Sequence, residues 1–210
     1  MSAGEAPYYI VFAGVNGAGK STLFNSGLWR LRGIPARLPR VNPDEIVREM
    51  GGDWRSPADQ MRAAREAVLR IRRLFDAKAS FNQETTLSGH AVIGNIRRAH
   101  EAGYRIHLYY VGVDSADIAL ARIAHRAEVG GHDIDRASVM RRYRTSLSGL
   151  AEALDYCEEA TVLDNTRSLT SVATWHRGTL SWWGNPQADA PWLLRAMTDE
   201  KLWRRTRRDG

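Results

Sequence analysis

The sequence predicts an α/β fold: a three-layer sandwich with a mainly parallel central sheet, a helical lid and a C-terminal β-hairpin. Three observations predict it. Strand candidates alternate with helix candidates from residue 8 to residue 163, the order expected of a parallel sheet covered by helices. The first strand candidate, Tyr8 to Ala13, is a short apolar run typical of a buried central strand. A glycine-rich loop and a helix candidate follow it directly.

The strand candidates are short apolar or β-branched runs between polar residues. The weakest covers residues 37–41, and the longest covers residues 105–113, which read RIHLYYVGV. A hairpin follows the last core strand and is expected to turn near Arg177 and Gly178. In chain order the candidates are 8–13, 37–41, 80–84, 105–113, 160–163 and the hairpin 172–183.

The helix candidates are marked by capping residues and by apolar residues three or four positions apart. Ser56 and Pro57 are typical of an N-cap and a first helical position, and Gly103 is typical of a C-cap. Asp114 or Ser115 is expected to cap the next helix, and Asp135 the one after it. The predicted helices are 21–31, a short one near 45, one from 57, 88–102, one from 115, one from 136 and 191–210. Their predicted buried residues are Met61, Ala64, Val68, Ile71, Phe75, Val92, Ile96, Ala99, Ile118, Ala121, Ile123, Val139, Tyr143, Leu147, Leu150 and Leu154.

The composition is that of a globular protein, and we expect one domain over residues 1–210, with a core of about 8–170 and a hairpin and helix of about 171–210. The formal net charge is +6, and only three of the 30 basic residues are lysines: Lys20, Lys78 and Lys201. An arginine-rich surface favours phosphorylated small ligands or nucleic acid, and biased codon usage explains it equally well. No nucleic-acid-binding motif is visible in the sequence.

The sequence also predicts where the protein acts. Cys157 is the single cysteine, so no disulfide forms within the chain, which suits a reducing compartment. The N-terminal residues do not read as a signal peptide, and no stretch approaches the roughly 18 apolar residues of a membrane span. We therefore expect a cytoplasmic protein with no membrane partner.

The glycine-rich loop carries the strongest chemical signal. Residues 14–21 read GVNGAGKS and match the phosphate-loop pattern G-x-x-x-x-G-K-[ST] at every fixed position. Glycines let successive N–H groups point at phosphate oxygens, the lysine reaches the β- and γ-phosphates, and the hydroxyl can ligate Mg²⁺. The pattern predicts a P-loop NTPase-type fold that binds ATP and Mg²⁺. The predicted nucleotide-binding residues are Gly14, Asn16, Gly17, Ala18, Gly19, Lys20, Ser21 (also on Mg²⁺) and Thr22.

Polar residues follow two further strand candidates, where ligands bind in open α/β sheets. Asp44 follows the second strand candidate; it could take a proton from an acceptor hydroxyl, cap a helix or hold Mg²⁺. Glu84 and Thr86 end the third and could hydrogen-bond an acceptor. No ordinary Walker-B aspartate ends the longest strand. Arginines on both sides of a glycine joint, residues 130–132, are typical of a lid that stabilises a transferring phosphoryl group. They are Arg122, Arg126, Arg141, Arg142 and Arg144.

In this order, the segments GVNGAGKST, NPDEI, ETTLSG, GYRIHLYYVGV, RxxxRxxxGGH, RRYRTSL and LDNT resemble the zeta-toxin group of P-loop kinases over residues 8–192. The resemblance implies ATP-dependent phosphorylation of the 3′-hydroxyl of the amino sugar in UDP-N-acetylglucosamine, and a helical antitoxin as protein partner. It implies Asp44 as base, Glu84 and Thr86 as substrate contacts, and catalytic Lys20. It also implies lid arginines at Arg126 and at Arg142 or Arg144. Asn165 follows the last strand, where P-loop kinases commonly hold adenine; the alternative there is a simple turn.

Two other hypotheses remain open from the sequence. The chain could phosphorylate a different small hydroxylated metabolite, a nucleotide or an antibiotic. It could instead be a nucleic-acid-dependent ATPase, which its positive charge favours and its lack of a nucleic-acid-binding motif disfavours.

Overall fold

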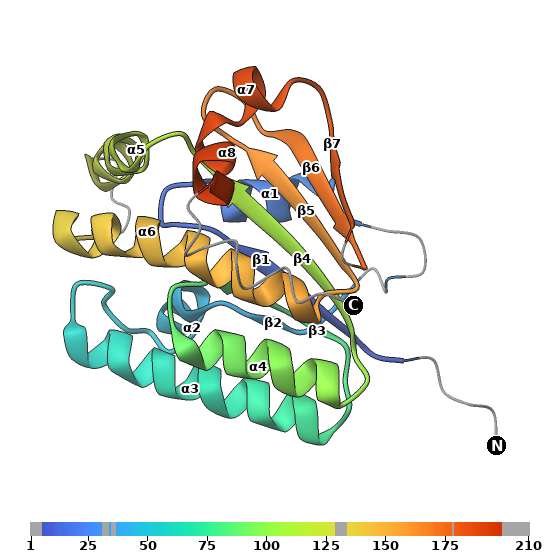
Figure 1. The fold of residues 1–210 in the computed structure, drawn as a ribbon. Helices are drawn as coiled ribbons and strands as arrows, with labels where there is room; N and C mark the ends of the chain where they lie inside the picture. Colours follow the sequence, from blue (N-terminus) through green and yellow to red (C-terminus); the bar gives the residue numbers. More distant parts are fainter. Residues whose placement is uncertain (1–5, 31–33, 35–36, 129–133, 178, 199–210) are drawn as a thin grey trace.

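The computed structural model describes residues 6–30, 34, 37–128, 134–177 and 179–198 (Figure 1). Seven strands form one sheet in the order β2-β3-β1-β4-β5-β6-β7, and all neighbouring pairs are parallel up to β5. The last two strands join antiparallel. The strands are β1 Tyr8–Ala13, β2 Arg40–Val41, β3 Phe81–Thr85, β4 Arg105–Gly112, β5 Glu159–Asp164, β6 Thr170–His176 and β7 Thr179–Trp182. The predicted α/β class, the mainly parallel sheet and the C-terminal hairpin are confirmed.

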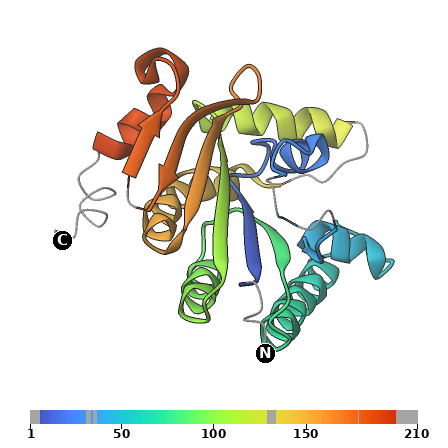
Figure 2. The same ribbon diagram turned by 90° about the vertical axis from the view of Figure 1, so that its right-hand side faces the viewer.

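Helices cover both faces of the sheet (Figure 2). Side chains of β1 alternate between two apolar cores because successive residues of a strand face opposite ways. Tyr9 and Val11 belong to the core that also holds α3 and α4, whereas Ile10 and Phe12 belong to the core with α1 and α5. The helices are α1 Lys20–Ser26, α2 Pro43–Glu49, α3 Pro57–Asp76, α4 His90–Glu101, α5 Ala116–Glu128, α6 Arg136–Ala153, α7 Pro186–Asp189 and α8 Pro191–Thr198. The three predicted layers are therefore present.

Most predicted caps occur, but several boundaries differ. Ser56 accepts a hydrogen bond from the Asp59 amide, and Asp135 accepts one from the Ser138 amide. Helix α1 ends earlier than predicted, because Gly27 adopts a positive φ of 70°. Strand β2 keeps only two of its five predicted residues. The predicted C-terminal helix is described as α8, and the rest of that prediction, from residue 199, lies outside the described residues.

The predicted buried face of α3 is partly wrong. Met61 and Val68 are each 56% exposed and Ala64 is exposed as well, whereas the buried residues recur at every fourth position. Alanines at two of these positions allow close packing, so the helix turns its small residues inward rather than the neighbouring apolar stripe. The buried residues are Ala63, Ala67, Ile71 and Phe75. In α5 the prediction fails in the same way at one position: Ala121 is exposed, and Ala119 is buried in its place.

Helix α6 crosses the end of the sheet. Val139, near its start, packs in the core with α1 and α5, while Leu150, near its end, packs in the core with α3 and α4. The residues between them therefore pass over the carboxyl ends of the strands, where the ligand crevice of an open α/β sheet lies. Among the described residues, no helix combines the length and the apolarity needed to cross a lipid bilayer.

We expect stability to fall in mild acid because of His107 on β4. Its side chain is buried, and within the described residues neither ring nitrogen has a hydrogen-bond partner. Burial lowers the pKa of His107 below its ordinary value of 6.5, although Glu159 and Glu158 oppose this. The unfolded chain then binds more protons, so the stability from neutral His107 is complete above about pH 6.5 and is lost as the pH falls below it.

This expectation is tested by urea unfolding of the protein and of His107→Phe at about pH 7.5 and about pH 5.5. The variant should lose less unfolding free energy between the two pH values. His125→Phe is the matched control, because the side chain of His125 is 80% exposed. An equal pH dependence in all three proteins would contradict the role of His107. The lowered pKa of Glu158, caused mainly by its hydrogen bond from Arg105, acts only at more acidic pH.

Candidate active site

The phosphate-loop sequence lies between β1 and α1, in the predicted strand–loop–helix setting. Gly14 has a φ of 133°, and a Cβ there would lie 2.1 Å from the carbonyl oxygen of Val111 on β4. Only glycine therefore fits where the loop leaves the sheet. The loop ends at Gly19, and Lys20 begins the helix. Its backbone N–H groups and the start of α1 meet at one place, which favours an anion there.

Lys20 is buried at the base of this loop. Its Nζ atom donates a hydrogen bond to the Val15 carbonyl oxygen at 3.2 Å and lies 3.9 Å from the Glu84 carboxylate. Burial lowers the pKa of Lys20; the carboxylates of Glu84 and Asp44 oppose this shift, while the guanidinium groups of Arg126 and Arg142 add to it. Four predicted site residues thus act on the lysine electrostatically.

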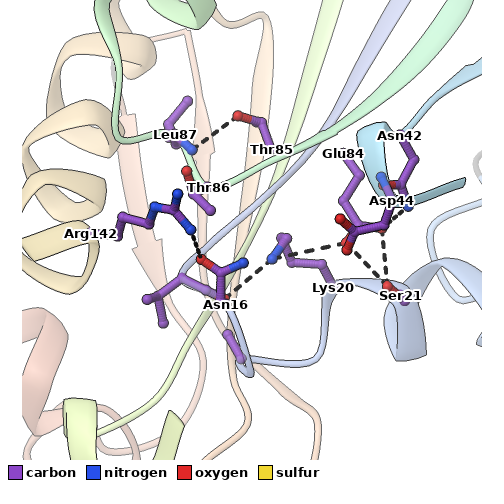
Figure 3. A network of polar contacts seen from close by, with 12 residues as sticks. Asn16, Lys20, Ser21, Asn42, Asp44, Glu84, Thr85, Thr86, Leu87 and Arg142 are labelled. Atoms are coloured by element: carbon purple, nitrogen blue, oxygen red, sulfur yellow. Dashed lines mark hydrogen bonds and ion pairs between the residues drawn. The ribbon is translucent and has the colours of Figure 1, made fainter. Parts of the chain in front are cut away.

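Glu84 connects the loop to the neighbouring strands (Figure 3). Strand β3 pairs in parallel with β1, and Glu84 lies opposite Phe12, so its side chain reaches the loop edge. Each of its carboxylate oxygens is 3.1 Å from Ser21 Oγ, which donates to them. The prediction of a substrate contact at Glu84 is untested by this geometry. The structure adds a direct contact with the predicted magnesium ligand, Ser21.

Arg40 on β2 holds the Glu84 carboxylate from the other side, and sequence reasoning missed it. It donates to Glu84, to Asn82 Oδ1 at 3.1 Å and to Glu45 at 2.9 Å. Its guanidinium carbon lies 3.6 Å from the centre of the Phe24 ring. The side chain is only 10% exposed. A buried arginine with three partners and an aromatic contact fixes the carboxylate in place. Its position at the end of a very weak strand candidate gave no signal.

Asp44 is the second residue of α2, and Asn42 takes the capping role. The Asn42 side chain accepts a hydrogen bond from the Asp44 amide at 3.0 Å, so the hypothesis that Asp44 caps this helix is wrong. Asn42 is the better cap here because Pro43 occupies the first helical position. Asp44 is left exposed and lines the same cleft as Lys20.

One open cleft of about 680 Å³ brings most predicted site residues together. Those that line it are Asn16, Gly17, Gly19, Lys20, Ser21, Thr22, Asp44, Glu84, Thr86, Arg122, Arg126, Arg142 and Asn165. Arg142 donates to Asn16 Oδ1 at 3.0 Å, so α6 contacts the phosphate loop directly (Figure 3). Arg144 is exposed on α6 and does not line the cleft. The predicted glycine joint at residues 130–132 lies outside the described residues.

A second cleft, of about 780 Å³, adjoins the first. Ser21, Asn42, Asp44, Trp54 and Arg126 line both, so Asp44 stands where the two meet. The sequence did not predict Trp54 as a site residue, because no motif distinguishes it from the other six tryptophans.

The segment after β5 also lines the first cleft, through Asn165. Asn165 Nδ2 donates to the Ala18 carbonyl oxygen at 2.7 Å, which joins this segment to the phosphate loop. Arg122 donates through Nη2 to the Thr166 carbonyl oxygen at 3.2 Å, and its Nη1 atom is buried with no hydrogen-bond partner among the described residues. Asn165 therefore does more than form a turn, because its side chain contacts the loop.

Gly149 on α6 is expected to be essential for stability. A Cβ at this position would lie 2.0 Å from the carbonyl oxygen of Leu87, in the segment that carries Thr86. Leu87 is fully buried and has a positive φ of 56°, so the segment cannot easily move away. Gly149→Ala should cost about 1–3 kcal/mol of unfolding free energy, as overpacking does.

Urea unfolding checks this expectation, with Gly94→Ala on α4 as the matched control. A Cβ at Gly94 meets nothing within 4 Å, so this change should stabilise the helix slightly. A Gly149→Ala protein as stable as the Gly94→Ala protein would show that the close approach of α6 to Leu87 is not constraining.

Comparison with known proteins identifies relatives and a shared fold. No protein-family model matches the chain. An uncharacterised protein of Haemophilus influenzae is 33% identical over 136 residues, which is 64% of this chain and 91% of the relative. A structure of the PezAT chromosomal toxin–antitoxin system of Streptococcus pneumoniae is 16% identical with a TM-score of 0.56, over 78% of this chain and 70% of that one.

The AvrRxo1-ORF1:AvrRxo1-ORF2 complex gives a similar result. Its native structure is 16% identical with a TM-score of 0.56, and the match covers 92% of this chain and 65% of that one. The chain thus spans less than two thirds of this neighbour. At such low identity these two structures establish the fold alone, which is the predicted P-loop NTPase-type α/β sandwich. The match to most of the Haemophilus influenzae protein goes further: this chain belongs to the same protein family.

Proposed function

We propose that the chain is an ATP-dependent kinase of a small hydroxylated molecule. One observation carries this proposal. A single open cleft is lined both by the phosphate loop with Lys20 and by the exposed carboxylate of Asp44. A protein that only binds a nucleotide, and transfers no phosphoryl group to an acceptor molecule, does not need a carboxylate in the same cleft. In a kinase, a carboxylate beside the γ-phosphoryl group can orient the acceptor hydroxyl and accept its proton.

The nucleotide end of the cleft fits a triphosphate. The loop N–H groups and the start of α1 favour phosphate oxygens, and Lys20 lies among them. Arg126 and Arg142 line the same cleft and would add positive charge around the γ-phosphoryl group. A solved AvrRxo1-ORF1:-ORF2 structure contains ATP, which supports the same assignment on this fold.

The residues next to Lys20 fit a magnesium ion. Ser21 Oγ lies 3.1 Å from the oxygens of the Glu84 carboxylate. Hydroxyl and carboxylate oxygens are the ligands that Mg²⁺ prefers. Bound there, Mg²⁺ would neutralise charge on the β- and γ-phosphates. Arg40 and Asn42 also contact Glu84, so they would hold its carboxylate in place when Ser21 turns to the ion.

Asp44 would orient the acceptor hydroxyl and accept its proton as the oxygen bonds to the γ-phosphorus, while the bond from the γ-phosphorus to the bridging oxygen breaks and ADP leaves. Thr86 lines the cleft on the acceptor side and can donate a hydrogen bond to the same molecule. The acceptor that we propose is UDP-N-acetylglucosamine. The resemblance to zeta toxins supports it, and so does the size of the space: two clefts of about 680 and 780 Å³ meet at Asp44, enough for more than a simple sugar. The antitoxin partner implied by the resemblance stays a prediction.

Mass spectrometry of a small-metabolite extract incubated with the protein, ATP and Mg²⁺ tests this function. We expect one compound to gain a phosphoryl group, and UDP-N-acetylglucosamine to gain it when supplied alone. Lys20→Met is the control for contaminating kinases. Phosphorylation of a different compound would support the kinase proposal and would show that UDP-N-acetylglucosamine is not the acceptor. ATP consumption that requires DNA or RNA, with no phosphorylated metabolite, would overturn the kinase proposal.

A further inference from the structure

The C-terminal helix α8 packs against the sheet through one tryptophan. Trp192 is 2% exposed. Its ring fills the space beside Gly112, the last residue of β4, where a Cβ would lie 2.1 Å from the indole. Its ring centre is 6.1 Å from that of Tyr110 on the same strand. The indole therefore packs against the carboxyl end of β4.

The polar edge of this indole reaches a buried carboxylate. Trp192 Nε1 donates to Asp164 Oδ1 at 2.8 Å, and Asp164 is only 8% exposed. Asp164 also accepts from the Thr166 amide at 2.8 Å and from the Thr166 hydroxyl at 2.6 Å. These bonds fold the backbone around Asn165, which lies between the two residues. A hydrogen bond to a buried charged group is among the stronger ones in a protein.

Asn165 connects the Asp164–Thr166 segment to the phosphate loop. Its backbone N–H donates to the Gly112 carbonyl oxygen at 2.9 Å, and its side chain donates to the Ala18 carbonyl oxygen at 2.7 Å. The Asn165 Nδ2 atom lies 2.3 Å from where a Cβ of Gly19 would stand. The position of Asn165 thus limits the shape of the loop, and Asn165 lines the cleft.

A second residue of α8 holds the neighbouring segment. Arg195 donates to the Asp114 carboxylate at 2.8 Å and to its carbonyl oxygen at 3.2 Å. The Asp114 amide donates in turn to the Thr166 hydroxyl at 3.0 Å. Asp114 lies just before α5, which carries Arg122 and Arg126 into the cleft. Two side chains of α8 therefore contact the residues that flank Asn165 and α5, and both Asn165 and α5 contribute side chains to the cleft.

We propose that Trp192 and Arg195 are positioning residues that set the affinity of the cleft for ATP. Neither lines the cleft; they act through Asp164 and Asp114 on Asn165 and the start of α5. This proposal rests on the proposed nucleotide binding at residues 14–21. It gives α8, which lies outside the core expected from the sequence, an indirect role in nucleotide binding.

The test compares Trp192→Phe and Arg195→Ala with the unaltered protein. Phenylalanine keeps an aromatic ring beside Gly112 but has no N–H for Asp164. Calorimetry with ATP and Mg²⁺ should show Kd about threefold to tenfold higher in Trp192→Phe, the loss expected from part of one charge-assisted hydrogen bond. In steady-state assays KM for ATP should rise similarly, with kcat and KM for the acceptor within about twofold of the unaltered protein.

Trp175→Phe is the matched control, because Trp175 on β6 is also buried, at 6% exposed, and does not line the cleft. It should leave the affinity for ATP unchanged. If Trp192→Phe does not fold, the inference is tested with Arg195→Ala alone. The Arg195 side chain is 61% exposed, so its removal should leave the fold intact. Unchanged ATP affinity in the folded variants would overturn the inference. An unaltered protein that binds no ATP would instead overturn the proposed function.

Discussion

Replacement of Asp44 by asparagine is expected to abolish phosphoryl transfer while the protein still binds ATP. Asparagine has almost the same shape but cannot accept the hydroxyl proton. The loss of a positioned general base should lower kcat on the order of 10²- to 10⁴-fold. Because Asn42, not Asp44, caps α2, the change should not disturb the helix. The measurement is the initial rate of acceptor phosphorylation, together with the Kd for ATP from calorimetry.

Asp117→Asn is the matched control for this variant. Its carboxylate is 75% exposed on α5 and pairs only weakly across the surface with Arg136, at 3.2 Å. It should retain full activity. If Asp44→Asn transfers phosphoryl groups at a rate within about twofold of the unaltered protein, Asp44 is not the general base.

The second large effect is expected at Lys20. Lys20→Met should lower phosphoryl transfer by at least about 10²- to 10³-fold, the loss usual for one charge that stabilises a transition state, and should weaken ATP binding as well. Folding should survive, because Glu84 keeps its contacts with Arg40 and Asn42. Removal of a buried charge with a lowered pKa also relieves a desolvation cost.

The transfer rate, ATP affinity and thermal melting of Lys20→Met check this expectation, beside Lys78→Met at an exposed position just after α3. The two lysine variants should melt at similar temperatures and differ only in binding and rate. Normal ATP affinity in Lys20→Met would show that Lys20 does not contribute to triphosphate binding.

Much of the site could be predicted from sequence because the carboxyl ends of parallel strands meet at one edge. The phosphate loop and Asp44 follow two strand candidates and Glu84 ends a third, and the parallel order β2-β3-β1 brings them together. The phosphate-loop pattern was complete, and polar residues stood at or just after the ends of the other two strand candidates, although the candidate before Asp44 was the weakest.

The rest depended on packing that a local pattern does not contain. Arg142 and Arg144 are two positions apart on α6, so about 200° of helix rotation separates them, and only one can face the cleft. The contact of Arg142 with Asn16, which lies 126 positions away in the chain, shows that this is Arg142. Arg40 and Trp192 gave no signal because their partners, Glu84 and Asp164, lie 44 and 28 positions away in the chain.

A structure of the protein with a non-hydrolysable ATP analogue and Mg²⁺ tests the central claim most directly. We expect the triphosphate to lie along residues 14–21, Lys20 Nζ to contact the β- and γ-phosphates, and the Asp44 carboxylate to face the γ-phosphorus across a gap that fits a hydroxyl group. A nucleotide bound elsewhere, or a γ-phosphate that points away from Asp44, would contradict the account.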